Sequence, residues 1–254
     1  MTPSVVLTIA AHDPLGGAGI AADLTTFAAH GLHGMVAVTA VTAQRFDAVE
    51  RVVATPADLL ADQLDGIIAS ASVAAVKVGL LFDAAQVAVV AERIADGRLP
   101  APVVDPVMVD GRGDRFVAAE IEAATRDLLF PRAAALTPNR AEAALLGADP
   151  AALAALGAGL VVVTGGGAGA TDLLVWPDAT TVELLGPWIE TANVRGSGCT
   201  FAAAMTSGLA LGDGLEAAAR RAKAFVAGQL GDSADWTVGP QGSVGPVSHR
   251  FTCE

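Results

Sequence analysis

Two glycines bracket a serine and lead into a thiol in the segment Asn-Val-Arg-Gly-Ser-Gly-Cys-Thr, residues 193–200. An alanine-rich stretch follows at once, so the segment is typical of a loop that feeds a helix N-terminus. The unpaired N–H groups and the partial positive charge of such an end attract an anion. Gly196 and Gly198 let the backbone approach it, Ser197 adds a hydroxyl, and the position is expected to lower the pKa of the Cys199 thiol. The alternative is a glycine-rich helix start without a ligand.

Two other groups of residues follow apolar runs and could contact a small molecule. The loop of residues 13–19 has three glycines in four positions, more than one turn needs, so Gly17, Ala18 and Gly19 are predicted to lie against a ligand. A simple strand–helix turn is the alternative. Gln44 ends the apolar run of residues 39–43. Its amide can donate and accept at once, which suits a heteroaromatic ring, although the spacing alone favours a loop cap.

Carboxylates and an amide suggest a cation site. Asp105 follows the apolar pair Val103-Val104, and Asn139 and Glu142 are three residues apart, on one face of a first helical turn. Together the three side chains could hold a hydrated Mg²⁺ ion, which prefers oxygen ligands and keeps several waters. The spacing of Asn139 and Glu142 fits a capping box equally well.

Thr164 and Gly166 end a further apolar run, residues 160–163, and either lie beside a nucleotide phosphate or form a tight turn. Lys77 stands inside an apolar strand and is expected to extend its ammonium to solvent. The four histidines are expected to be structural.

Apolar runs alternate with helical patterns along the chain, which is 53% hydrophobic. This alternation predicts a single α/β domain spanning residues 1–254, with a doubly wound, mainly parallel sheet flanked by helices on both faces. In such a fold the loops after the strands meet at one edge of the sheet. Strands are predicted at residues 5–10, 36–41, 49–55, 75–78, 103–104, 134–136, 160–163, 172–176 and 180–184, and helices at residues 20–30, 56–70, 83–96, 118–129, 140–146, 198–211 and 215–231.

The formal net charge of −12 argues against nucleic-acid and anionic-membrane partners, because both need a basic surface. Any phosphate must be held by helix ends, a few Arg and Lys side chains, and a metal ion. Residues 151–171 carry no charge before Asp172, but six glycines interrupt them, so a buried strand and turns are expected there instead of a membrane span. Two distant cysteines and no visible leader segment predict a reduced, cytoplasmic setting.

Taken together, the motifs resemble hydroxymethylpyrimidine/phosphomethylpyrimidine kinase, a family of the ribokinase-like superfamily that serves thiamine biosynthesis. The resemblance runs in order over nearly the whole chain. A thiol in the anion-binding loop is the most specific point, because sugar kinases of the superfamily usually have Asp there. The matching segments are residues 7–14, 16–20, 22–24, 39–44, 77–81, 105–109, 137–139 and 196–200.

This resemblance implies a role for each matching residue. Gln44 would bind a pyrimidine ring, and Cys199 would act at the anion hole formed by Gly196, Ser197 and Gly198. ATP and Mg²⁺ would be the cofactors, for phosphorylation of a hydroxymethyl group and then of the resulting monophosphate; a homodimer is left open. The other assignments are Asp23, Gly17, Ala18, Gly19, Leu80 and Val107 for the substrate, Asn139, Thr164, Gly166 and Arg195 for the nucleotide, and Asp105 and Glu142 for the metal.

The chain also departs from that family's pattern. A Lys-Gly-Gly-His segment is replaced by Thr-Gly-Gly-Gly at residues 164–167, Thr-His by Val194-Arg195, and a lysine expected after Met108 is absent. Arg112, Arg115 and Arg195 are candidates to replace the lost charge. A pyridoxal kinase of the same superfamily and a non-catalytic pyrimidine-binding relative are the alternative interpretations.

Overall fold

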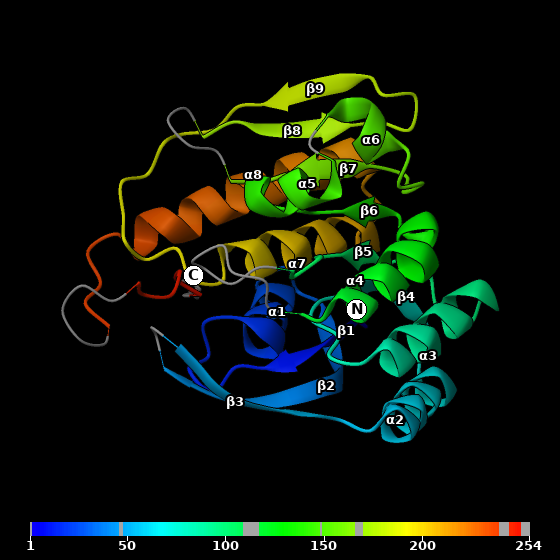
Figure 1. Cartoon of the computed structure of the whole chain (residues 1–254). Helices are drawn as coiled ribbons and strands as arrows, with labels where there is room; N and C mark the ends of the chain where they lie inside the picture. Colours follow the sequence, from blue (N-terminus) through cyan, green and yellow to red (C-terminus); the bar gives the residue numbers. More distant parts are fainter. Residues whose placement is uncertain are drawn as a thin grey trace.

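One mixed sheet organises the protein (Figure 1). The computed structural model describes residues 2–45, 48–108, 117–147, 149–165, 170–238 and 244–249. Through these residues the sheet has nine strands in the order β3-β2-β1-β4-β5-β6-β7-β8-β9. The pairs from β2 to β7 are parallel, whereas β3, β8 and β9 add antiparallel edges. The mainly parallel sheet predicted from the sequence is confirmed.

The elements alternate along the chain as expected. The strands are β1 (Val5–His12), β2 (His33–Arg45), β3 (Ala48–Ala54), β4 (Val73–Val78), β5 (Val103–Val104), β6 (Ala135–Leu136), β7 (Val161–Val163), β8 (Asp172–Val175) and β9 (Thr181–Leu184). The helices are α1 (Gly19–Ala29), α2 (Ala57–Ser70), α3 (Ala84–Ala95), α4 (Ala119–Ala124), the π-helical η1 (Thr125–Leu129), the 3₁₀ turn η2 (Phe130–Arg132), α5 (Arg140–Leu146), α6 (Pro150–Ala154), α7 (Ser197–Ala210) and α8 (Leu215–Asp232).

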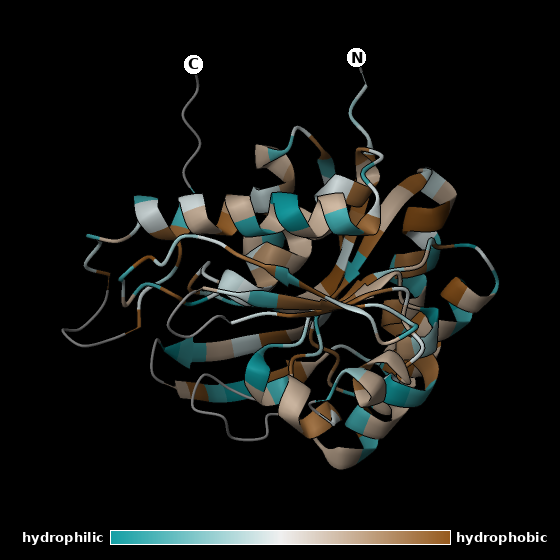
Figure 2. Ribbon diagram, turned by 90° about the horizontal axis from the view of Figure 1, so that it is seen from above, coloured by the Kyte–Doolittle hydropathy of each residue, from teal (hydrophilic) through white to brown (hydrophobic). Residues whose placement is uncertain are grey.

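Helices cover both faces of the sheet, with apolar strands between them (Figure 2). Helices α1, α7 and α8 pack on one face, where Val6 contacts the cluster that contains Phe27 and Ala203. Helices α2 to α6 pack on the other, in the cluster that contains Leu7 and Ile9. Successive residues of a strand point to opposite faces, so a strand buried on both sides must be apolar throughout.

Two regions differ from the sequence-based prediction. The helix predicted over residues 118–129 is α-helical only to Ala124 and then widens into the π-helical η1. Residues 244–249, within the tail expected to be irregular, instead pair with the loop before α7, because Arg195 and Pro246 form a parallel bridge. Within the described ranges, none of the helices combines the length and apolarity that crossing a bilayer requires.

Candidate active site

The N-terminus of α7 meets the loop of residues 13–19 through two backbones in close contact. Gly196, which caps α7, has a φ of +81°, and a Cβ there would collide with the carbonyl oxygen of Gly17. Gly19, which begins α1, has a φ of +56°, and a Cβ there would collide with the carbonyl of Ala11. The glycines are therefore required for backbone geometry and close approach. The two predicted ligand-binding loops lie side by side, at the carboxyl-terminal edge of β1.

Cys199 lies in the first turn of α7, where it contacts both the loop of residues 13–19 and the end of β5. Its sulfur accepts a hydrogen bond from the backbone N–H of Gly19, and its thiol bonds to the carboxylate of Asp105 beyond β5. The expectation that the helix end lowers the thiol pKa is wrong. Burial, together with the nearby negative charge of Asp105, raises the pKa of Cys199 to about 12 despite the opposing charge of Lys77. The free protein therefore holds a protonated thiol.

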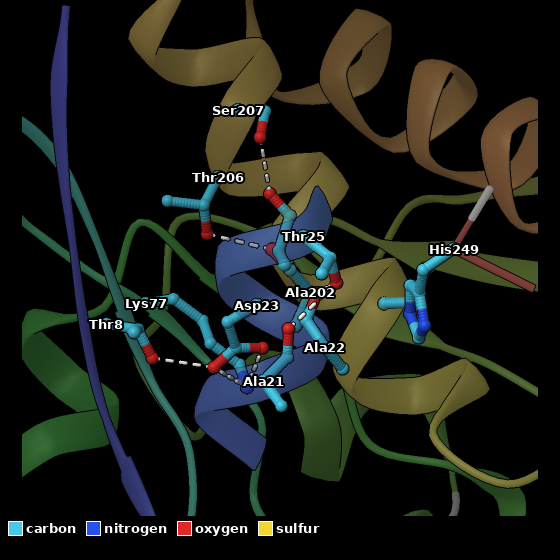
Figure 3. A network of polar contacts seen from close by, with 12 residues as sticks. Thr8, Ala21, Ala22, Asp23, Thr25, Lys77, Ala202, Thr206, Ser207 and His249 are labelled. Atoms are coloured by element: carbon cyan, nitrogen blue, oxygen red, sulfur yellow. Dashed lines mark hydrogen bonds and ion pairs between the residues drawn. The ribbon is translucent and has the colours of Figure 1, made fainter. Parts of the chain in front are cut away.

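Lys77 corrects a second expectation, because its ammonium does not reach solvent. The side chain is fully buried, and Nζ lies 2.8 and 2.9 Å from the two carboxylate oxygens of Asp23 on α1. Thr8 of β1 donates to the same carboxylate at 2.6 Å. Figure 3 shows the three side chains converging. Burial lowers the pKa of Lys77, but the charge of Asp23 outweighs it, so the pKa lies above its ordinary value and the ammonium persists.

This network also changes the role of Asp23. The carboxylate was assigned to the substrate, but it is fully buried and both its oxygens are occupied by Lys77 and Thr8. A carboxylate in that position supports the start of α1 from beneath the site and presents no free oxygen to a ligand. Lys77 lies close to the active-site strand end as well, because Nζ is 3.2 Å from where a Cβ of Gly79 would be.

Gln44 reaches the same loop edge from the end of β2. Its Nε2 donates to Oδ1 of Asp13, a carboxylate that is only 4% exposed. The backbone N–H of Leu15 donates to the same oxygen at 2.9 Å, and Nη2 of Arg195 lies 3.4 Å from Oδ2. Gln44 is therefore more than a loop cap. Arg195, which was assigned to the nucleotide, lies beside Asp13 and Gly17.

Asn139 and Glu142 form a capping box at the start of α5, which was one of the two alternatives. Oδ1 of Asn139 accepts from the N–H of Glu142 at 3.0 Å, and Oε2 of Glu142 accepts from the N–H of Asn139 at 2.9 Å. Oε1 of Glu142 accepts from the N–H of Met108 at 3.1 Å. Both carboxylate oxygens of Glu142 thus accept hydrogen bonds from backbone N–H groups, and these bonds connect α5 to the segment after Asp105.

The remaining predicted residues fall into two groups. Leu80, Asp105 and Val107 line one hollow at the ends of β4 and β5. Thr164 is bridged to Asn139 and so lies next to the capping box, on the other side of β6. Gly166, Arg112 and Arg115 lie outside the described residues. Among the residues that are described, no three His, Cys, Asp or Glu side chains cluster as a ready metal site.

Sequence reasoning missed two supporting residues, Lys77 and Asp13. The available signals for the buried ion pair were a lysine in the apolar strand β4 and an aspartate in the apolar helix α1, which precedes that strand by more than forty residues. Asp13 was visible only as part of a glycine-rich loop, and its contact with Gln44 spans 31 residues of sequence.

The geometry agrees with a family found by comparison with known sequences. The model of the family described as phosphomethylpyrimidine kinase matches residues 13–248. The chain belongs to the phosphomethylpyrimidine kinase family. It is therefore a phosphotransferase, and the resemblance given by its motifs is confirmed over nearly the whole chain.

Relatives of this phosphomethylpyrimidine kinase family member match it end to end. The hydroxymethylpyrimidine/phosphomethylpyrimidine kinase of Streptomyces coelicolor is 38% identical, with 99% of this chain and 96% of the relative covered. That of Synechococcus elongatus is 40% identical, with 99% of each covered. Among solved structures, an ADP complex of Bacillus subtilis pyridoxal kinase has a TM-score of 0.88 and 33% identity, with 98% of each chain covered. The ribokinase-like fold is thereby confirmed.

Proposed function

We propose that the protein transfers the γ-phosphoryl group of ATP to the hydroxymethyl oxygen of 4-amino-5-hydroxymethyl-2-methylpyrimidine, and then to the monophosphate so formed, in thiamine biosynthesis. The observation that carries this proposal is the meeting of the α7 N-terminus, the loop of residues 13–19 and Gln44 at one sheet edge. The relatives that match the whole chain carry the same activity in their names.

Each part of the edge has a task in this reaction. Gln44 and the backbone of residues 17–19 hold the ring, and Leu80 and Val107 line the hollow beside them. The N–H groups at the start of α7 face the phosphoryl group, where negative charge is spread over three oxygens in the transition state. Phosphoryl transfer depends mostly on such positioning and charge stabilisation, so few side chains need to react.

Cys199 is assigned a positioning role, because its thiol is protonated in the free protein. We infer that it holds the reacting hydroxyl by hydrogen bonding. Cys199→Ala should then lower kcat by less than about 10²-fold. A loss of roughly 10²–10⁴-fold, the usual range for general base catalysis, would overturn the positioning role and assign proton transfer to the thiol. Cys199→Asp, which places the superfamily's usual carboxylate there, is expected to keep part of the activity.

ATP and Mg²⁺ are the proposed cofactors. The related pyridoxal kinase structure is an ADP complex, which supports the use of a nucleotide. We place that nucleotide next to Asn139 and Thr164, which the structure brings together. The carboxylate of Asp105 suits a hard cation that keeps several waters. Both oxygens of Glu142 already accept backbone N–H groups, so we infer that Glu142 acts on the cation through a bound water. Bound Mg²⁺ would neutralise charge on the phosphates. The protein's own part is to hold Asp105 at the end of β5.

A pyridoxal kinase is the second candidate, favoured by the similarity to the Bacillus subtilis enzyme. Release of ADP should be measured with the hydroxymethylpyrimidine, its monophosphate and pyridoxal as phosphoryl acceptors. We expect kcat/KM to be highest for the two pyrimidines. A higher value with pyridoxal would replace the proposed substrate, and turnover with none of them would favour a non-catalytic pyrimidine-binding protein.

We further propose that the protein acts on small molecules in the cytoplasm, without nucleic-acid or membrane partners. The net charge of −12 supports this, because it opposes binding to either polyanionic surface.

A further inference from the structure

The carboxylate of Asp13 restricts how the amide of Gln44 can face a ligand. An ionised carboxylate only accepts hydrogen bonds, so the side-chain atom of Gln44 that faces Oδ1 must be the donor Nε2. A free glutamine amide can turn over and exchange its donor and acceptor ends. Here the turned amide would place its oxygen against a carboxylate that is only 4% exposed. The order of acceptor and donor along the amide is therefore fixed.

Three contacts hold Asp13 itself in place. The N–H of Leu15 donates to Oδ1 at 2.9 Å, the N–H of Gly16 donates to the backbone oxygen of Asp13 at 3.1 Å, and Nη2 of Arg195 lies 3.4 Å from Oδ2. The carboxylate is thus anchored by its own turn and by the loop before α7. Oδ1 accepts hydrogen bonds from the N–H of Leu15 and from Nε2 of Gln44, whereas Oδ2 faces the guanidinium of Arg195. The two oxygens have separate tasks.

The amide oxygen of Gln44, which Asp13 does not contact, determines which group of a ligand can bind there. In the part of the chain that the structure describes, Oε1 of Gln44 has no hydrogen-bond partner, and the side chain is half-buried at the loop edge. An acceptor oxygen in a fixed position calls for a donor on the ring. A 4-aminopyrimidine presents that donor, whereas the 4-oxo form of the same ring presents an oxygen there and carries its hydrogen on the neighbouring nitrogen.

We propose that Asp13 is a positioning residue that makes Gln44 select an aminopyrimidine over the corresponding oxopyrimidine. The inference rests on the proposed function, in which Gln44 binds the ring. Selection arises by exclusion as well as attraction, because the wrong ring would bring two acceptors together. Leaving a polar group unpaired in the site costs about 1–3 kcal/mol, so two such groups correspond to a discrimination of about thirtyfold or more.

The test measures equilibrium binding by calorimetry, independently of turnover. The probes are 4-amino-5-hydroxymethyl-2-methylpyrimidine and its 4-oxo analogue. The wild-type protein should bind the amino ring at least about thirtyfold more tightly. In Asp13→Ala the amide of Gln44 is free to turn over and can pair with either ring, so the preference should fall to within about fivefold. A role in folding alone would weaken the binding of both rings by the same factor.

A conservative variant and a remote control sharpen the test. Asp13→Asn should keep the preference, because the N–H of Leu15 requires an oxygen at the Oδ1 position and that same oxygen orients Gln44. Asp65→Ala removes a carboxylate ion-paired to Arg93 on the opposite face of the sheet and should also keep it. In a Gln44→Ala background, adding Asp13→Ala should leave the ratio of the two affinities unchanged.

The outcomes separate this inference from the proposed function. A preference that survives in Asp13→Ala, or that is lost equally in Asp13→Asn, overturns the role of Oδ1 while the pyrimidine kinase assignment stands. A wild-type protein that binds neither ring overturns the proposed function and this inference with it.

Discussion

Replacing Lys77 by methionine should destabilise the protein strongly and make its stability depend on pH. The ammonium and the carboxylate of Asp23 are both fully buried and 2.8 Å apart. Removing one partner of such a pair leaves an uncompensated buried charge, which typically costs about 3–5 kcal/mol. The loss is a large fraction of the free energy of unfolding of an ordinary domain, about 5–15 kcal/mol.

The pH dependence follows from the carboxylate that is left behind. Without Lys77, the folded-state pKa of Asp23 should rise far above its unfolded value near 4, because only burial and Thr8 remain. A raised folded-state pKa means that stability is present at low pH and is lost as the pH rises through that value. Lys77→Met should therefore regain about 2–3 kcal/mol between pH 7 and pH 5, relative to the wild type.

Urea denaturation at pH 5, 6 and 7 measures this directly, provided that the slope of the transition is unchanged. The double variant Lys77→Met with Asp23→Asn should recover part of the stability and lose the pH dependence. Arg220→Met is the control, because its pair with Glu216 is exposed to solvent and its loss should cost much less. The reasoning would be refuted if the free energy of unfolding of Lys77→Met lay within about 1 kcal/mol of the wild-type value, or if it did not change with pH.

Three further predictions concern the active site. In a Cys253→Ser background, iodoacetamide should alkylate Cys199 about tenfold faster for each pH unit from 7 to 10, because only the thiolate reacts. A rate that reaches a plateau near neutral pH would instead show that the pKa of Cys199 is lowered. Glu142→Gln should cost about 1–2 kcal/mol in urea denaturation, since an amide cannot accept from both backbone N–H groups; unchanged stability with a shifted Mg²⁺ dependence of turnover would favour a direct metal ligand. Gly196→Ala should lower the free energy of unfolding by more than about 1–2 kcal/mol, whereas Gly198→Ala, with open space around it, should cost less in the same assay.

Much of the fold could be predicted from the sequence, because apolar runs and helix patterns are local signals. Each predicted strand is present, and the segments after β1 and β5 do meet the end of β2 or α7 at one edge, as expected for a parallel sheet. The site was harder, since its chemistry depends on contacts between distant residues. The partner of Lys77 is 54 residues away in sequence. The pKa of Cys199 is set by burial and by the charges of Lys77 and Asp105, which are far from it in sequence, so no local pattern reveals it.

The position of α7 has a consequence for how the protein is made. The nine strands of the described residues end at Leu184, yet α7 and α8, which cover one face of the sheet together with α1, span residues 197–232. Asn193 then ties the loop before α7 to still later residues, donating to the carbonyls of Ser233 and Trp236. At ribosomal speeds of about 5–20 residues per second, a growing chain therefore carries these strands for several seconds while the part of the face that α7 and α8 cover is still bare. The strands are synthesised before α7 and α8, the two helices that complete the cover of this face. A chain released before α8 is complete would expose apolar strand residues and would aggregate instead of folding.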